Sequence, residues 1–80
     1  MSKAQQWVAF RRTWKKKHPP NDEGFYECWL CGKWVLPNEI TLDHVIPRSR
    51  RPDLVFEETN IKPACWTCNT LKGSKVIDSL

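Results

Sequence analysis

Two groups of side chains in this 80-residue sequence have types and spacings that could do chemistry. One is a set of four cysteines, and the other is an aspartate–histidine pair followed by well-placed asparagines. The pair, Asp43 and His44, lies in the otherwise apolar run LDHVIP. An isolated Asp-His dipeptide can be a buried structural pair, part of a zinc site or a catalytic pair, and its context must decide.

The four cysteines form two Cys-x-x-Cys pairs with 33 residues between them. Two residues between cysteines let both sulfurs reach one ion, and two such pairs complete a tetrahedral zinc site. Two disulfides are the alternative, with three possible pairings. The long separation requires a folded insertion between the pairs. Because four protein ligands leave no open position, we expect a structural zinc held by Cys28, Cys31, Cys65 and Cys68.

The length of the chain favours such a metal. Eighty residues make one domain at most, and a domain of this size buries too little apolar surface to be stable without a staple. The N-terminus lacks the apolar stretch of a signal peptide, and no transmembrane run follows. We therefore expect a reducing, cytoplasmic setting, in which cysteine pairs bind metal more often than they form disulfides.

The positive charge of the chain is unevenly distributed. The net charge is +4, yet residues 1–21 hold six basic residues and no acidic one, whereas the rest holds seven basic and nine acidic residues. A second basic cluster contains Arg48, Arg50 and Arg51. Such patches are typical of nucleic-acid binders, although a solvated charged surface is the common alternative for a single run.

The first 20 residues predict a basic, amphipathic helix. Ser2 is a candidate N-cap, the aromatic residues Trp7, Phe10 and Trp14 recur at helical spacing, and Pro19 follows the expected end near residue 17. The aromatic stripe is expected to pack on the rest of the domain. The basic residues that fall largely away from it are Arg12, Lys15 and Lys16.

The insertion between the cysteine pairs predicts a β-hairpin. Residues 33–36 and 40–45 resemble two strands, and residues 37–39 the turn that joins them. A helix is expected to begin at the second cysteine pair and to end at Gly73. The predicted fold is thus a small α+β domain over residues 1–80. Its core, residues 25–74, is a hairpin and a helix stapled by zinc.

Three segments in order resemble the HNH endonucleases, a family with a ββα-metal active site. They are LDHVIPRS, the asparagine of TNIKPAC, and CWTCNTLKG. With the first cysteine pair they span about residues 28–73. The resemblance implies that His44 is the general base, that Asp43 and Asn69 hold one divalent metal, that Asn60 orients the base and braces the loop, and that Lys72 lies near the substrate phosphate.

The residue types that the resemblance assigns to the site suit phosphodiester hydrolysis. Phosphodiester hydrolysis needs an activated water and positive charge at the phosphate and leaving oxygen. An imidazole with a pKa near 6.5 suits the first task, and hard oxygen ligands favour Mg²⁺ or Mn²⁺ for the second. The last position of the family's motif is often histidine. Here it is Asn69, so the chain resembles a His-Asn-Asn variant of the family. Because neighbouring strand residues point to opposite faces, the strand must end or twist at Asp43 and His44.

The sequence therefore predicts a metal-dependent DNA endonuclease, and a nickase if one chain acts alone. The alternatives are a zinc-stabilised nucleic-acid-binding module without catalysis, and an interaction protein that uses zinc as a scaffold. We expect DNA as the partner, no membrane, and a monomer or weak dimer. We expect the protein to act in a bacterial cytoplasm and to be encoded by a host or a phage. It is expected to act alone or in a larger DNA-processing assembly. The expected DNA contacts are Arg12, Lys15, Lys16, Arg48, Arg50, Arg51 and Lys72.

Overall fold

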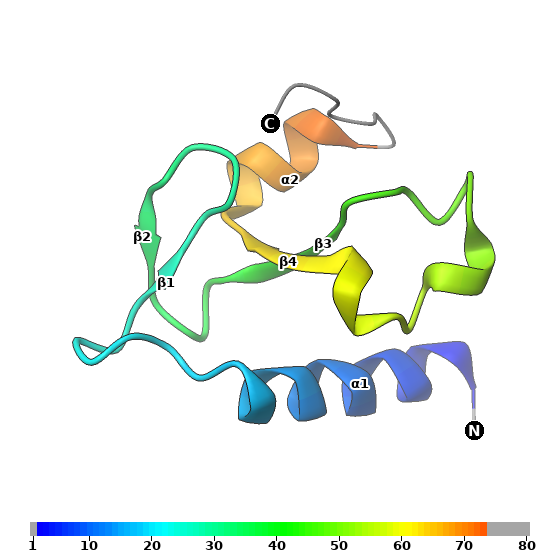
Figure 1. The fold of residues 1–80 in the computed structure, drawn as a ribbon, viewed down its shortest axis with the longest axis horizontal. Coiled ribbons are helices and arrows are strands. Elements are labelled where there is room, and N and C mark those ends of the chain that lie inside the picture. The colour runs from blue at the N-terminus through cyan, green and yellow to red at the C-terminus, as the bar shows by residue number, and fades with distance from the viewer. Residues whose placement is uncertain (1, 74–80) are drawn as a thin grey trace.

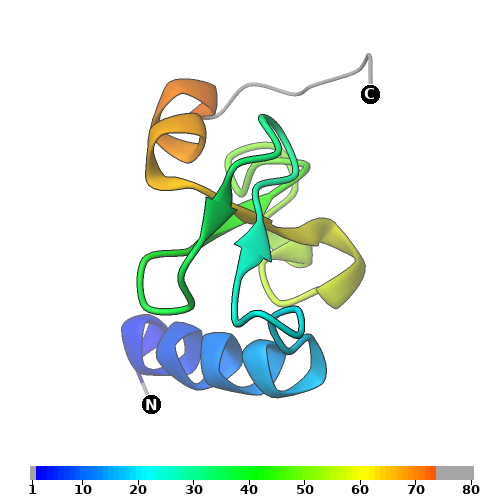
Figure 2. The same cartoon turned by 90° about the vertical axis from the view of Figure 1, so that its left-hand side faces the viewer.

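A computed structural model describes residues 2–73 of the chain (Figure 1). Helix α1 (Lys3–Lys17) and helix α2 (Trp66–Lys72) lie on opposite sides of two small antiparallel sheets. The view in Figure 2, turned by a right angle, shows the same three layers. Neither helix is long and apolar enough to cross a membrane, within the part of the chain that is described.

Helix α1 begins with a capping box, as the Ser2 position suggested. The Ser2 hydroxyl accepts a hydrogen bond from the Gln5 amide at 3.2 Å, and the Gln5 side chain accepts one from the Ser2 amide at 2.9 Å. The helix ends at Lys17, where three lysines in the last turn complement the helix dipole. The predicted helix over residues 2–17 is confirmed.

The strands pair differently from the prediction. Strand β1 (Tyr26–Glu27) pairs with β2 (Trp34–Val35), and strand β3 (Thr41–His44) pairs with β4 (Ile61–Ala64). The predicted hairpin between residues 33–36 and 40–45 is therefore wrong. The segment before the second cysteine pair, for which no strand was predicted, is strand β4.

The pairing follows from where the cysteines must meet. The first cysteine pair forms the turn between β1 and β2, so β2 already has a partner when the chain reaches β3. Strand β4 carries the second pair to the first, and the Trp29 amide donates a hydrogen bond to the Pro63 carbonyl at 3.0 Å. The connection from β3 to β4 is a loop, residues 45–60, with short 3-10 turns at Pro52–Leu54 and Glu58–Asn60.

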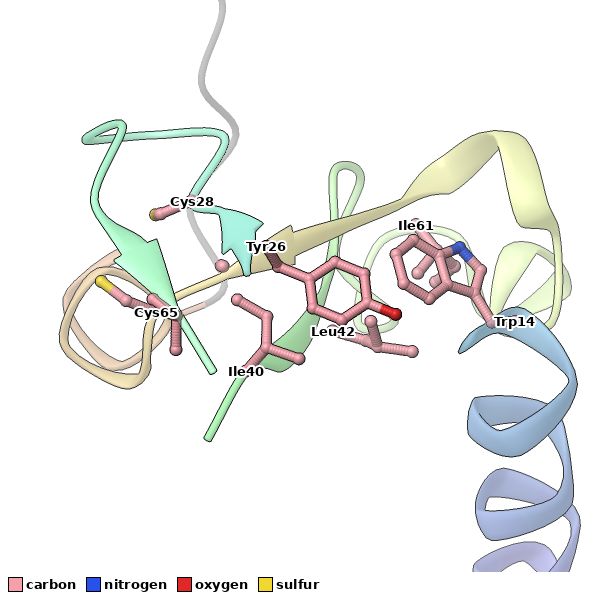
Figure 3. Packing of buried hydrophobic residues seen from close by; sticks show 9 residues of the cluster. Trp14, Tyr26, Cys28, Ile40, Leu42, Ile61 and Cys65 are labelled. Atoms are coloured by element: carbon pink, nitrogen blue, oxygen red, sulfur yellow. The ribbon is translucent and has the colours of Figure 1, made fainter. Parts of the chain in front are cut away.

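The hydrophobic core fills the space between α1 and the strands. Trp14 is the buried residue of α1, and it packs against Tyr26 with ring centroids 6.0 Å apart. Figure 3 shows these two side chains beside Ile61, with Leu42 and Ile40 continuing the core toward the cysteines. Burial of this set fixes α1 to the sheets, since each large apolar side chain contributes about 1.5–3 kcal/mol on leaving water.

The β3–β4 hairpin and helix α2 form the ββα arrangement, and the β1–β2 hairpin and α1 surround it. Element types, the grouping of the cysteines and the N-terminal helix agree with the predicted fold class. The small α+β fold of the ββα-metal type is confirmed, with the strand pairing corrected.

Candidate active site and metal centre

The four cysteine sulfurs form a single cluster. The Sγ atoms of Cys28, Cys31, Cys65 and Cys68 all lie within 4.8 Å of one another, and those of Cys31 and Cys65 are 3.8 Å apart. A tetrahedral zinc with Zn–S bonds of about 2.3 Å requires sulfurs separated by about 3.8 Å. No disulfide joins any of the four in this structure, and the grouping of all four sulfurs favours a shared metal ion over two separate disulfides. The cluster fits a closed, structural zinc site.

The two cysteine pairs reach this geometry by different routes. In the first pair, Gly32 has φ +78, a backbone conformation that residues other than glycine rarely adopt. The Gly32 amide donates a hydrogen bond to the Cys28 carbonyl at 2.9 Å. In the second, Cys65 is the N-cap of α2, and its sulfur accepts a bond from the Cys68 amide at 3.4 Å. The second pair needs no glycine because the first helical turn already directs amides at the sulfur.

The thiols of the cluster affect one another's ionisation in opposite directions. Burial opposes ionisation of Cys28, but hydrogen bonds from the backbone of Cys31, Cys65 and Leu30 lower its pKa to about 6. Hydrogen bonds with Cys65 and Cys31, together with burial and the Cys28 charge, raise the pKa of Cys68 to about 12. Four thiolates at this spacing therefore require a compensating positive charge, which zinc supplies.

The Asp-His pair lies at the end of β3, where its two side chains point to opposite faces. Asp43 is directed toward α2 and contacts Lys72, whereas His44 is directed toward α1 and contacts Trp7. Strand β3 ends at His44 and a bend follows. Both residues, and Asn69 of α2, border one open cleft of about 800 Å³. Because β3 ends here, side chains from both of its faces border the same cleft.

The His44 ring is held by a hydrogen bond from the loop. Its Nε2 lies 3.0 Å from the Val55 carbonyl oxygen. A carbonyl can only accept, so Nε2 carries the hydrogen of the neutral ring and Nδ1 is the basic nitrogen. Burial, aided by the charges of Arg48 and Lys72, lowers the pKa of His44 below its ordinary value of 6.5 against the opposing effects of Val55 and Asp43. The imidazole is accordingly a neutral acceptor at pH 7.

Asn60 ties the start of the loop to its end. The residue is 6% exposed, and its side chain accepts a hydrogen bond from the Ile46 amide at 2.8 Å and donates one to the Ile46 carbonyl at 3.0 Å. The Val45 amide also donates to the Asn60 carbonyl at 2.9 Å. These three bonds fix the backbone directly after His44. An amide side chain carries a donor and an acceptor on separate atoms, so it can bond to both the N–H and the C=O of one residue in this way.

Asp43 is almost completely enclosed. The residue is 3% exposed, Lys72 Nζ lies 3.2 Å from Oδ1, and Trp29 Nε1 donates to Oδ2 at 3.0 Å. Lys72 is itself 4% exposed and also donates to the His44 carbonyl at 2.8 Å. The Lys72 ammonium is thus buried in an ion pair in this structure, and its place near the substrate phosphate stays a prediction. The hydrogen bond from Trp29, which lies inside the first cysteine pair, to Asp43 was not predicted, since no periodicity or motif marks this role.

The oxygen atoms near the cleft nevertheless suit a hard divalent cation. An ionised carboxylate offers about four lone-pair positions, and the two hydrogen bonds of Asp43 use only two of them. Asn69 donates through Nδ2 to Thr41 Oγ1 at 2.9 Å and to the Leu42 carbonyl at 3.4 Å. Among residues 2–73 its Oδ1 has no hydrogen-bond partner. Two oxygen donors completed by water and phosphate are a typical protein contribution to a Mg²⁺ site.

The buried ion pair leads to a prediction about stability. Lys72→Met keeps most of the side-chain volume but leaves the Asp43 carboxylate buried without its countercharge. We expect the free energy of unfolding of the zinc-loaded protein to fall by about 3–5 kcal/mol in urea denaturation. The exposed Lys16→Met is the control and should change it by less than about 0.5 kcal/mol. Equal effects of the two variants would show that the ion pair does not form.

The basic residues predicted to contact DNA differ in where they lie and in whether they have a partner within the protein. Arg48 borders the cleft and Arg50 is exposed beside it, whereas Arg51 forms a two-pronged ion pair with Asp53 at 2.8 and 3.0 Å. In α1, Lys15 donates to the Pro37 carbonyl at 2.8 Å. The remaining exposed basic residues of the prediction, which do not border the cleft, are Arg12 and Lys16.

The first two turns of α1 form one wall of the cleft. Lys3, Gln6 and Trp7 border it, opposite Arg48 and Phe56 of the loop. The location of these residues at the cleft was not predicted. They lie outside the motif segments, in a stretch with the pattern of an ordinary amphipathic helix. Their position follows from the docking of α1 through Trp14.

Comparisons with known proteins identify the family. The family model described as HNH endonuclease matches residues 27–75, more than half of the chain. Searches of the curated proteins and of the solved structures found no match. The matched residues contain both cysteine pairs, the β3–β4 hairpin, the loop and helix α2, which build the cysteine cluster and all of the cleft except the wall that α1 forms. The chain therefore belongs to the HNH endonuclease family.

Proposed function

We propose that the protein is a metal-dependent DNA endonuclease that hydrolyses phosphodiester bonds with His44 as general base. Membership of the HNH family implies a metal-dependent nuclease or a nucleic-acid-binding role. The observation that favours catalysis is the His44 ring, which borders the cleft with Nε2 bonded to the Val55 carbonyl. One ring nitrogen is bonded to the backbone and the other is not hydrogen-bonded to residues 2–73, which is the arrangement that a general base requires.

The hydrogen bonds of His44 define its part in the reaction. Nδ1 takes a proton from the attacking water, and the resulting imidazolium keeps its Nε2 hydrogen bond to Val55, which stabilises the positive charge. Asn60 holds the backbone after His44 in place through its bonds to Ile46 and Val45, so the ring keeps its position relative to the cleft. Among residues 2–73, nothing hydrogen-bonds to Nδ1, which leaves it open to water.

Asp43 and Asn69 are the residues that would hold the catalytic ion. A bound Mg²⁺ or Mn²⁺ supplies positive charge at the phosphate and at the leaving oxygen. The exposed guanidinium of Arg48, on the same cleft, is positioned to bind a flanking phosphate. Arg50, Arg12 and Lys16 are exposed and extend the basic surface for the DNA backbone.

Cleavage of a supercoiled plasmid tests this proposal and separates it from a binding module. One chain carries one cleft with this histidine, so a monomer nicks one strand and gives open circles before linear product. The zinc-loaded protein is incubated with plasmid and Mg²⁺ or Mn²⁺, with and without EDTA. Plasmid that stays intact with both ions while its mobility shifts in a gel would identify a non-catalytic binder. The enclosure of Asp43 by Lys72 and Trp29 is the observation that favours that second function.

The pH dependence of cleavage follows from the lowered pKa of His44. A protonated ring cannot accept a proton, so activity disappears as the pH falls through the pKa of the folded protein. Since burial lowers that pKa, the half-maximal point of kcat/KM is expected below pH 6.5, the ordinary value for histidine. Rates measured at saturating metal across the acidic range check this. A half-maximal point above 6.5 would contradict the neutral, partly buried base.

A further inference from the structure

Helix α1 contributes an aromatic side chain to the face of the proposed base. The rings of Trp7 and His44 are stacked, with centroids 5.1 Å apart and an interplanar angle of 27°. Trp7 belongs to the first half of α1, which lies alongside the loop of residues 45–60 (Figure 1). The family model begins at residue 27, so this contact comes from a part of the chain that the family match does not cover.

Trp7 is held in place by two phenylalanines. Its ring stacks on Phe10 of the same helix at 5.5 Å and meets Phe56 of the loop at 6.4 Å, and Phe10 and Phe56 are 5.5 Å apart. The indole is therefore gripped by α1 and by the loop at once. The same loop carries Val55, whose carbonyl accepts the His44 hydrogen bond. Both contacts of the His44 ring thus come from one packed unit.

The two contacts restrain different motions of the imidazole. The torsion that rotates a histidine ring about its own axis has a broad, roughly two-fold preference, so a ring held loosely can turn over and exchange its nitrogens. The hydrogen bond to Val55 fixes the position of Nε2 at one edge of the ring. The Trp7 indole covers the ring face and prevents the tilt that one hydrogen bond permits. Together they determine where Nδ1 lies.

We propose that Trp7 is a positioning residue, which acts through His44 by stacking on its ring and fixing the direction of Nδ1. This inference rests on the proposed nuclease function. It makes α1 a part of the active site as well as a basic arm, and it explains why the aromatic stripe of the helix extends to its first turns. A displacement of about 1 Å at a reacting group can lower a rate about 100-fold, so loss of the stack should be visible in turnover.

A set of three variants separates positioning from simple stability. Trp7→Leu keeps an apolar side chain but removes the ring, and Trp7→Phe keeps a ring that can stack. Val35→Ala is the stability control, because it removes volume from the buried core at β2, and Val35 neither belongs to α1 nor borders the cleft. Zinc-loaded proteins are compared at a temperature where circular dichroism shows each to be folded.

Two readouts are needed. In plasmid cleavage, Trp7→Leu should lower kcat about 10- to 100-fold with KM changed by less than about 2-fold, and Trp7→Phe should recover most of it. In proton NMR, the His44 ring resonances of the wild type should lie upfield, shifted by the indole, and should move downfield in Trp7→Leu. Val35→Ala should leave both the resonances and kcat close to those of the wild type.

The outcomes distinguish failure of this inference from failure of the proposed function. Cleavage by the wild type, with Trp7→Leu as active as Trp7→Phe, would overturn the positioning role and leave the nuclease function intact. Equal losses in Trp7→Leu and Val35→Ala, without rescue by phenylalanine, would reduce the role of Trp7 to a contribution to stability. No cleavage by the wild type with either metal would overturn the proposed function, and the positioning role with it.

Discussion

Cys28→Ser is expected to leave the chain unfolded under conditions in which the wild type is folded. Structural zinc contributes about 10–16 kcal/mol in small zinc-binding peptides, whereas the whole free energy of unfolding of a typical domain is about 5–15 kcal/mol. Among the described residues, the apolar core has nine buried members, two of which are the proposed zinc ligands Cys28 and Cys65. Losing the metal therefore removes more free energy than the remaining core can replace.

Circular dichroism and NMR measure the effect. Zinc-loaded wild type should melt cooperatively, and protein stripped of zinc by a chelator should show poor chemical-shift dispersion that returns on addition of one equivalent of Zn²⁺. Cys28→Ser should not recover in this way. Exposed Ser49→Ala is the control, and should keep both the transition and the response to zinc. A stripped protein that still unfolds cooperatively would show that the core suffices without the metal.

His44→Ala is expected to lower the cleavage rate about 100- to 10,000-fold, the range typical of a general acid or base. The loss should appear in kcat, because the base acts in the chemical step and Arg48 still borders the cleft for binding. DNA affinity in a gel-shift titration should stay within about 3-fold of the wild type if the exposed basic residues dominate it.

The chain offers a matched control for this variant in its one other histidine. His18 is the C-cap of α1, stacks on Trp14 with ring centroids 4.5 Å apart, and does not border the cleft. His18→Ala should therefore cleave plasmid at a rate within about 2-fold of the wild type. If His44→Ala cleaves as fast as His18→Ala, the general base is another group and the proposed mechanism is wrong.

Local signals in the sequence predicted the features that depend on neighbouring residues. The capping box of α1 needs only Ser2 and Gln5, the end of α2 needs only Gly73, and the metal cluster follows from the spacing of the cysteines. These depend on backbone geometry within a few residues, which composition and spacing describe well. The family resemblance added the order of the motif segments, and the family match agrees with it.

Features that depend on distant contacts were not predictable in the same way. The partner of β3 lies beyond the 45–60 loop, so its pairing depends on where the cysteines meet and not on local alternation. Lys72 was expected near the substrate phosphate, and its burial in an ion pair with Asp43 was not predicted. The contact of Trp7 with His44 depends on how α1 docks, and a helical aromatic stripe fixes only which face is buried.

The place of Trp29 limits how this domain could be redesigned or reduced in size. The indole that donates to Asp43 stands between Cys28 and Cys31, so the loop that wraps the structural ion also reaches the carboxylate of the cleft. A version that replaced the metal with a disulfide would keep the chain closed but would redirect the peptide that carries this ring. A minimal nuclease cut from this fold must therefore retain the tetrahedral sulfur geometry, since the staple and the reacting groups share one short segment of backbone.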